Sequence, residues 1–288
     1  MTATSTSTSY QKVHNPQTTW ADKIRKNWVR WLLILLVFGY VGFLIVTPIV
    51  ALIFGAFEKG IGASVSSLIQ PEIATAFWNT LWISLVVVLI HGVFGTITAW
   101  VFVRDRFPGR DLLNSLVDMP FAISPVVAGY MLLLLFGRGG ILAPVLEPLG
   151  IQVAFALPGM VLATLFVTLP FMIRELIPVL ESFDIRQEKA SFTLGASGWQ
   201  TFWRITLPVL RWGLVYGITL TFARALGEFG AVLVIGGGVQ GRTETATLFI
   251  YRALDERQYV AAYSAALLLG LFSLLLVTGS HWLRRKED

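Results

Sequence analysis

Residues 188–208 read EKASFTLGASGWQTFWRITLP, a polar segment with two glycines that lies between two long apolar runs. Its first residues, Glu188 to Leu194, predict a short helix, and Gly195 permits a left-handed turn. Ser197 is a residue type that caps the start of a following helix. Because each flanking run is long enough to cross a bilayer, the contrast predicts a membrane protein with a helix, a turn and a second helix between two spans.

Composition sets the class of protein. The chain of 288 residues is 55% hydrophobic and 14% charged, with a mean hydropathy of +0.71, whereas soluble domains average about 25% charged residues. A hydrocarbon core of about 30 Å needs roughly 20 apolar residues in a helix. The length therefore accommodates six spans with short loops and no separate soluble domain, so the predicted fold class is an all-α, polytopic membrane protein.

Six apolar runs are candidates for these spans. They lie at about Trp31 to Phe57, Ala76 to Val103, Leu112 to Phe136, Leu157 to Leu180, Gly213 to Ile235 and Tyr259 to Leu283. The first run is too long for the apolar region of a signal peptide. Residues 1–22, most of them Ser, Thr and other polar types, are predicted to form a disordered tail, and residues 23–288 the membrane domain.

The distribution of basic residues predicts the orientation. With an even number of spans both termini lie on one side, and if that side is the cytoplasm, 16 of the 22 Lys and Arg residues lie there. The opposite loops hold five, namely Lys59, Arg138, Arg242, Arg252 and Arg257. The positive-inside rule favours this arrangement. The polar loop at about 181–211 is then cytoplasmic, as are both termini.

Several kinds of site are excluded. The chain has no Cys and three His residues, His14, His91 and His281, so we predict no metal site. Basic residues cluster at the ends of apolar runs rather than on one face, which argues against nucleic-acid binding.

A GxGxxG pattern begins at Gly236, but no βαβ unit surrounds it. No Gly-Lys dipeptide occurs, so the chain lacks a P-loop for ATP, and we expect it to be non-catalytic and to hold no cofactor.

The spacing within the polar loop resembles the EAA loop of permeases of ATP-binding-cassette (ABC) importers. The matching positions are Glu188, Ala190, Gly195, Ile205, Leu207 and Pro208, and Lys189 departs from the pattern. The resemblance implies that Glu188, Lys189, Ala190, Gly195, Ala196 and Ser197 form a coupling helix seated on a cytoplasmic ATPase. On this interpretation Pro208 ends the segment before the fifth span. Trp199, Phe202 and Trp203, at spacing i, i+3 and i+4, form a stripe expected at the membrane interface.

Further strings extend the resemblance from about residue 31 onward. They are FPGR at 107–110, DMPFAISPVVAG at 118–129, TLPFMIRELIPV at 168–179, LGASGWQ at 194–200 and ARALGEFGAV at 223–232. Together they are similar to the W-type permeases of sulfate/thiosulfate ABC importers, and molybdate permeases share some of them. The resemblance implies a type I permease fold in the bacterial plasma membrane and a T-type permease partner. It also implies two ATPase subunits that bind ATP and Mg²⁺, and an extracytoplasmic sulfate-binding protein.

Charged and polar residues within the apolar runs are candidates for the translocation path. Arg224 and Glu228 lie four residues apart in the fifth run, where an isolated charge costs at least about 2.5 to 3.5 kcal/mol, so they are expected to pair on one helix face. They line an anion path or form a structural ion pair. In the third run, Asp118, Ser124 and two prolines predict a broken helix that lines a cavity or simply kinks.

Two other classes of function are consistent with a polytopic chain. A secondary transporter or channel would use Asp118, His91 and the Arg224–Glu228 pair as an ion or proton relay. A membrane-embedded enzyme would need a nucleophile with a base, or a cofactor site, and the sequence offers neither. A lone His91 in an apolar run is more typical of a helix contact. The EAA-like loop favours the ABC permease.

Overall fold

The computed structural model describes residues 20–285, and over that range the chain is helical without a strand. The predicted tail at 1–19 lies outside the described residues, whereas residues 20–22 belong to the first helix. The chain divides into two units, residues 1–51 and residues 52–288. The boundary falls within α1 (Trp20–Phe57), whose apolar window has no residue buried inside the chain.

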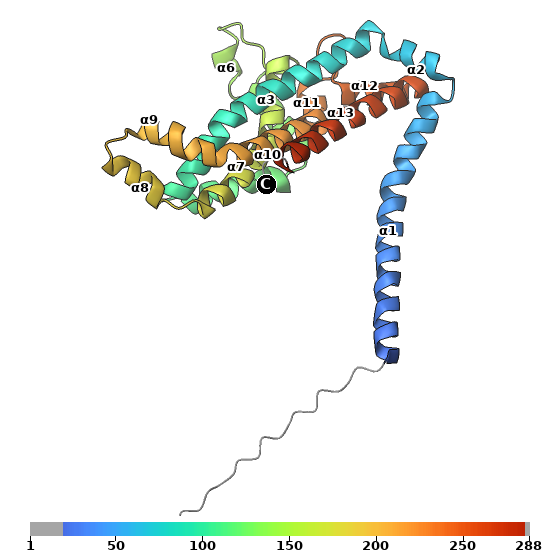
Figure 1. The fold of residues 1–288 in the computed structure, drawn as a ribbon. Helices are drawn as coiled ribbons and strands as arrows, with labels where there is room; N and C mark the ends of the chain where they lie inside the picture. Colours follow the sequence, from blue (N-terminus) through green and yellow to red (C-terminus); the bar gives the residue numbers. More distant parts are fainter. Residues whose placement is uncertain (1–19, 286–288) are drawn as a thin grey trace, which may run out of the picture. The chain divides into compact units, whose positions relative to one another are not determined.

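The second unit is built around three long helices, α3 (Pro71–Arg104), α7 (Leu157–Ser182) and α10 (Leu207–Leu226), with α13 (Tyr259–Arg285) packed beside them (Figure 1). Shorter helices complete it. They are α2 (Ile61–Leu68), α4 (Arg110–Ala122), α5 (Pro125–Phe136), α6 (Ala143–Leu146), α8 (Arg186–Thr193), α9 (Gly198–Thr201), the π-helical turn η1 (Phe202–Thr206), α11 (Gly230–Gly236) and α12 (Ala246–Asp255).

Five helices in the described part are long and apolar enough to cross a membrane. They are Trp28–Phe57 of α1, α3, α7, the continuous stretch Gly198–Leu226, and Tyr259–Ser280 of α13. The pair α4 and α5 supplies a sixth span if it is taken together, but it bends by 113°. Four of the predicted runs therefore each correspond to one spanning helix. The predicted break in the third run is confirmed. Pro120 lies inside α4, and the break falls at Ile123 and Ser124, before Pro125 begins α5.

The fifth predicted run, Gly213 to Ile235, is wrong as a continuous span. Its helix begins at Gly198 and ends at Leu226, and Gly227 to Phe229 separate it from α11. The prediction that Pro208 ends the preceding segment is also wrong. Pro lacks an N–H and clashes with the carbonyl four residues before it; the wider turn of η1 just upstream lets the helix run on past Pro208.

Close helix packing in the second unit depends on small residues, as is usual in membranes. A Cβ added at Gly213 would lie 3.0 Å from Val179, and one at Gly217 would lie 2.5 Å from the sulfur of Met172, so both glycines let α10 approach α7. Buried side chains form three clusters. Helix α3 contributes to all of them, with Val87 in one, Phe102 in the second and Ile73 in the third.

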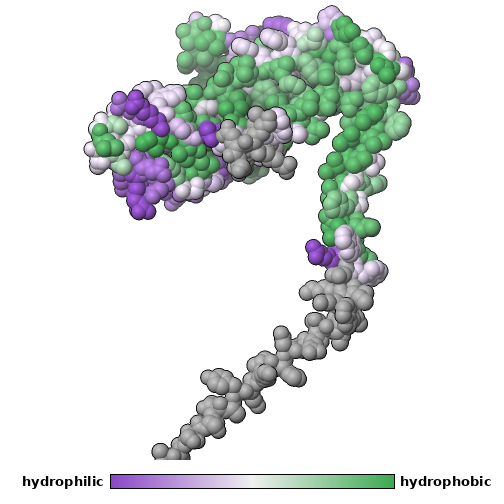
Figure 2. All heavy atoms as spheres, viewed as in Figure 1, coloured by the Kyte–Doolittle hydropathy of each residue, from purple (hydrophilic) through white to green (hydrophobic). Residues whose placement is uncertain are grey.

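The end of this unit that holds α8 and α9 carries an extensive polar surface. Figure 2 shows apolar side chains over the long helices, hydrophilic ones around α8 and α9, and smaller hydrophilic patches along the upper edge and at the opposite end. Figure 1 places α8 and α9 at one end of the unit, and α2 and the start of α3 at the other. The segment singled out in the sequence therefore lies where the long helices α3, α7 and α10 begin or finish.

Candidate functional site

The segment 181–211 folds as the sequence predicts, as a helix, a turn and a second helix. Helix α8 ends in a Schellman arrangement: the N–H of Ala196 donates to the carbonyl of Ser191 at 3.0 Å, and the N–H of Gly195 donates to that of Phe192 at 3.0 Å. Gly195 has φ of 87°, the left-handed conformation that glycine adopts without strain. The turn is thus fixed by backbone hydrogen bonds.

Ser197 starts the second helix with a capping box. Its hydroxyl accepts a hydrogen bond from the N–H of Gln200 at 3.3 Å, while the Gln200 side chain accepts from the N–H of Ser197 at 2.9 Å. The predicted cap is confirmed. The turn is therefore bounded on both sides by hydrogen bonds, one set at the end of α8 and the other at the start of α9. These bonds hold α8 and α9 in a defined relative geometry.

Glu188 points into the protein, so its carboxylate does not lie on the free surface of α8. It is 7% exposed. Its Oε2 lies 3.2 Å from Nε of Arg104, and Nη2 of Arg104 donates to its Oε1 at 3.3 Å. The hydroxyl of Thr206 donates to the same Oε1 at 2.9 Å. Glu188 thus joins α8 to the end of α3 and to η1.

The same junction includes α7. The guanidinium carbon of Arg104 lies 5.6 Å from the ring centre of Phe183, the buried residue that follows α7, within the range of a cation–π contact. Ser191, also buried, bonds Thr201 at 2.7 Å across the turn. We call Arg104, Phe183, Glu188 and Thr206 the Arg104 junction. It connects the segment 181–211 to the long helices.

The outward surface of the segment is free for contact. The other positions implied as coupling residues, Lys189, Ala190, Gly195 and Ser197, are exposed, and Ala196 is half-buried. Two large apolar side chains lie among them: Leu194 is 88% exposed and Phe192 is 53% exposed. Phe192 also lines an apolar groove next to Glu188, whereas Leu194 is almost fully exposed. We call the face formed by Phe192, Leu194 and Lys189 the contact face.

The side chains of the aromatic stripe, Trp199, Phe202 and Trp203, pack against one another. The rings of Trp199 and Trp203 lie 5.4 Å apart and those of Phe202 and Trp203 lie 5.8 Å apart, both edge to face. With Trp100 of α3 they line an apolar groove of about 750 Å³ next to Glu188. The stripe therefore packs on itself and faces α3 across a groove, and its depth in a membrane stays a prediction.

Arg224 and Glu228 form the predicted ion pair, with Nη1 of Arg224 2.8 Å from Oε2 of Glu228. They do not share a helix face, because Glu228 lies in the break after α10. There its Oε1 accepts from the N–H of Ala231 at 2.9 Å, which caps the first turn of α11. The Glu228 side chain is 2% exposed and that of Arg224 is 30% exposed. Glu228 is held structurally, and the side chain of Arg224 stays partly exposed.

Asp118 has a partner that the sequence analysis did not assign. Arg174 of α7 donates to both of its carboxylate oxygens, from Nε at 2.7 Å and Nη2 at 2.6 Å, and also to the carbonyl of Asn114 at 3.1 Å. This bidentate pair joins α4 to α7. Ser124 is exposed in the break between α4 and α5 and makes no side-chain cap.

The two helix breaks meet. A Cβ at Gly230 would lie 3.0 Å from the side chain of Val126 and 3.3 Å from that of Pro125, so the start of α11 packs against the start of α5. A Cβ at Gly129 would lie 2.8 Å from the carbonyl oxygen of Ala231. The structure therefore brings Ser124 and the Arg224–Glu228 pair to neighbouring breaks, and leaves Asp118 on the α4–α7 contact.

Sequence analysis missed Arg104, Thr206 and Arg174. Arg104 and Glu188 are 84 residues apart, so no local spacing reveals their contact. Arg174 could have been recognised, since a charge inside a predicted span needs a partner. Because it lies near the end of the fourth run, it is counted with the cytoplasmic loop instead. His91 is the helix contact that its surroundings predict: its Nε2 lies 3.1 Å from both the carbonyl of Leu165 and the hydroxyl of Thr168 on α7.

The described part contains no cluster of three or more His, Asp or Glu residues suited to a metal ion. The turn from Gly236 to Gly241 joins α11 to α12 and follows no strand. The polar groups of the site are ion pairs and helix caps.

Comparison with known proteins gives the family. Residues 91–286 match the family described as "Binding-protein-dependent transport system inner membrane component". The chain is 47% identical over 236 residues to the Sulfate transport system permease protein CysW of Synechococcus elongatus, with 82% of each chain covered. It is 48% identical over 262 residues to Sulfate permease 2, chloroplastic, of Chlamydomonas reinhardtii, which covers 91% of this chain and 70% of that one.

A solved structure shares the fold. A bacterial ABC transporter that imports the acidic polysaccharide alginate has a chain that superposes with a TM-score of 0.77, at 18% identity, over 92% of this chain and 98% of that one. The ABC importer permease fold and the multi-pass membrane class predicted from the sequence are confirmed. The chain belongs to the inner-membrane components of binding-protein-dependent transport systems, and within them to the group of W-type sulfate permeases.

Proposed function

We propose that this chain is one of two permease subunits of an ATP-driven sulfate importer, and that the segment 181–211 couples it to a cytoplasmic ATPase. The observation that carries the proposal is the construction of this segment. Its turn is fixed by a Schellman arrangement and a capping box, its inner side is joined to α3 and η1 by Glu188, and its contact face is free. A rigid, anchored segment with an exposed apolar face is suited to transmit movement from a partner.

The partners follow from the names of the relatives and from the resemblance. One group of relatives is named Sulfate transport system permease protein CysT, including a protein of Escherichia coli that is 37% identical, so a T-type permease is the expected second half. A bacterial alginate ABC transporter has been solved in complex with a periplasmic protein that holds an alginate pentasaccharide. A sulfate-binding protein at the outer face and two ATPase subunits at the inner face complete the proposed assembly.

In this assembly the chain itself catalyses no reaction. The ATPase subunits bind ATP and Mg²⁺, and no cofactor resides in this chain. Both termini lie in the cytoplasm and the spans in a bacterial plasma membrane, in contact with lipid, as the 16 to 5 distribution of basic residues favours. ATP-driven closure of the ATPase pair moves the segment 181–211, and the spans alternate between inward-open and outward-open states.

Arg224 is the residue proposed to meet the anion. Its side chain is partly exposed while that of Glu228 is buried beside it, and guanidinium groups bind tetrahedral oxyanions through paired hydrogen bonds. Glu228 offsets the positive charge, so the contact is brief rather than tight. Ser124, exposed at the neighbouring break, is proposed to line the same path, and Asp118 to position α4 through Arg174.

The experiment that tests the substrate uses the purified complex in nanodiscs with its binding protein. ATP hydrolysis is measured with the binding protein loaded in turn with sulfate, thiosulfate and molybdate. We expect sulfate to stimulate hydrolysis. Stimulation by molybdate alone would replace the proposal with the alternative of a molybdate permease, and no stimulation by any oxyanion would contradict an ATP-driven oxyanion importer.

A further inference from the structure

Helix α3 has a distinct polar attachment at each end. At its C-terminal end Arg104 belongs to the junction with Glu188. At its N-terminal end it holds the loop 237–245, which joins α11 to α12: Nδ2 of Asn79 donates to the carbonyls of Arg242 at 3.2 Å and Glu244 at 3.0 Å. Asn79 and Arg104 are 25 residues apart, or about 38 Å along a helix.

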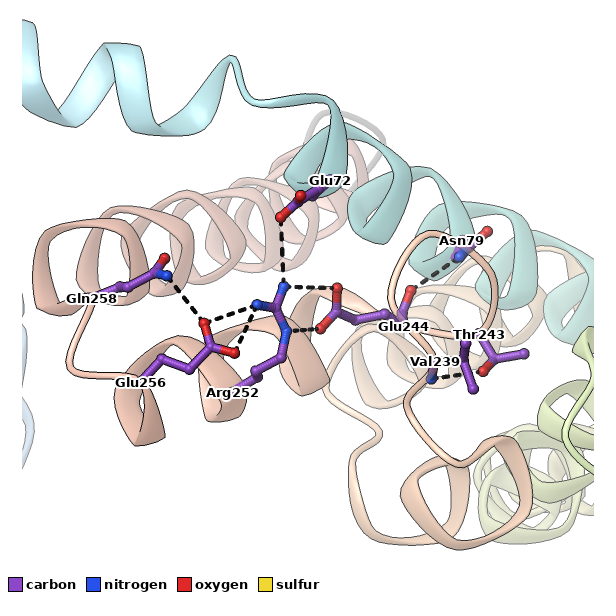
Figure 3. Close-up of polar contacts among 8 residues, drawn as sticks. All are labelled: Glu72, Asn79, Val239, Thr243, Glu244, Arg252, Glu256 and Gln258. Carbon is purple, nitrogen blue, oxygen red and sulfur yellow. Dashed lines mark hydrogen bonds and ion pairs between the residues drawn. The ribbon is translucent and has the colours of Figure 1, made fainter.

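The loop 237–245 is stabilised further by the network in Figure 3. Arg252 of α12 donates to Glu244 from Nε at 2.7 Å, and the Glu244 side chain is 2% exposed. The same guanidinium lies 3.0 Å from Glu256 and 3.9 Å from Glu72 at the start of α3. The hydrogen bonds that Arg252 donates to the Glu244 carboxylate raise the pKa of Arg252 above its ordinary value, so the guanidinium stays charged at any physiological pH.

The first turn of α12, which directly follows the loop 237–245, contacts both α3 and the candidate path. The N–H of Ala246 donates to the hydroxyl of Thr80 on α3 at 2.8 Å. One residue further on, the hydroxyl of Thr247 donates to the carbonyl of Glu228 at 2.6 Å. A displacement of the first turns of α3 would therefore reach Glu228, and with it Arg224, through one short stretch of chain.

Of the long helices that meet the segment 181–211, α3 is suited to transmit a displacement. Proline lies inside α7 at Pro170 and Pro178, and α10 follows the π-helical turn η1. Helix α3 has proline only in its first turn and continues for 34 residues. It also contributes buried side chains to all three packed clusters.

We propose that α3 carries the movement of the segment 181–211 to the Arg224–Glu228 pair. At one end Arg104 of α3 binds Glu188, and toward the other end Asn79 binds the loop 237–245 and Thr80 binds the first residue of α12. The proposal rests on the proposed coupling to an ATPase. It assigns positioning roles to Arg104, Asn79 and Thr80, which act through α3 without contact with the anion. Spatial continuity alone does not establish such coupling, so the test measures both ends.

The test uses spin labels, which the absence of cysteine in the chain makes straightforward. One label is placed at Gln187→Cys in the segment 181–211, outside the contact face, and in a separate sample another at Val239→Cys in the loop 237–245; both side chains are exposed. Each is measured in the complete complex in nanodiscs, with the binding protein, before and after ATP is trapped with vanadate. We expect the spectrum to change at both positions.

The helix is then loosened between its two attachments. Leu85 and Leu89 of α3 are 47% and 62% exposed, so Leu85→Gly with Leu89→Gly adds backbone freedom without opening the core. Leu85→Ala with Leu89→Ala removes the same contacts and keeps a strong helix former. The glycine pair should lose the ATP-dependent change at Val239 and keep the change at Gln187, and the alanine pair should keep both.

Each remaining result is decisive. An unchanged response at Val239 in the glycine pair overturns the proposal, as does a response at Gln187 without one at Val239 when α3 carries no substitution. If the glycine pair does not assemble, Asn79→Ala decides in its place: loss of the Val239 response supports the proposal and retention overturns it. Absence of any ATP response at Gln187 when α3 carries no substitution contradicts the coupling to an ATPase itself.

Discussion

The carboxylate of Glu188 is enclosed by this chain, which changes how an EAA-like glutamate acts here. It holds α8 against Arg104 and Thr206 and leaves contact with a partner to its exposed neighbours. Two buried charges that pair stabilise each other, while either charge alone is costly. The position of the contact face therefore depends on a buried ion pair on its inner side.

Glu188→Gln is predicted to destabilise the complex. Glutamine retains an oxygen that accepts from Thr206 but leaves the Arg104 guanidinium buried without a counter-charge, at a cost of about 3 to 5 kcal/mol. The double variant Arg104→Met with Glu188→Leu removes both charges and should recover most of the stability. The melting temperatures of the purified complexes measure this, and a double variant less stable than Glu188→Gln would refute the explanation.

Substitution of Arg224 can separate a role in the anion path from a role in stabilising the fold. Alone, Arg224→Gln leaves Glu228 buried without its partner, so assembly should suffer. Arg224→Gln with Glu228→Gln removes both charges and keeps an oxygen that can cap α11. We expect this pair to assemble normally yet to import sulfate poorly, as measured by assembly in detergent and uptake in proteoliposomes. Normal uptake by the double variant would assign Arg224 to structure alone.

At the scale of elements, the contact between α5 and α11 is predicted to tolerate no added atom. Gly129→Ala places a Cβ 2.8 Å from the carbonyl oxygen of Ala231 and 2.8 Å from the Cβ of Val234, and overpacking of this kind costs about 1 to 3 kcal/mol. Gly270→Ala on α13 is the matched control, because no atom lies within 4 Å of its added Cβ. Equal melting temperatures for the two variants would contradict the tight contact.

Local chemistry in the sequence was enough to predict several elements. Gly195 and Ser197 indicate the turn and the cap after α8, and Pro125 indicates the break before α5, because each acts on its immediate neighbours. The break at Gly227 to Phe229 was missed, since glycine in an apolar run is equally typical of close helix packing. The wide turn before Pro208 depends on how η1 packs, which local propensity does not encode.

The site was predictable only in part, for a similar reason. The spacing of Arg224 and Glu228 predicted their pairing, but not that Glu228 caps a separate helix. Arg104 and Glu188 meet only when α3, α7 and the segment 181–211 are assembled. Contacts between distant parts of the chain arise from tertiary packing, and a single sequence carries no direct signal for them.

For the whole molecule, the orientation of the chain can be tested with the same two single-cysteine variants. Gln187→Cys is predicted to face the cytoplasm and Val239→Cys the outside. A membrane-impermeant maleimide applied to intact spheroplasts should therefore label Val239→Cys and leave Gln187→Cys unlabelled until the membrane is opened. The reverse pattern would invert the topology and remove the segment 181–211 from the reach of a cytoplasmic ATPase.

The central claim is that the chain transports sulfate only as part of an ATP-driven assembly. The most direct measurement is uptake of radiolabelled sulfate into proteoliposomes that contain either this chain alone or the complete complex with its binding protein. We predict uptake in the complete complex with ATP, none without ATP, and none for the chain alone. Uptake by the chain alone, driven by an ion gradient or by sulfate itself, would contradict the account and indicate a secondary transporter or channel.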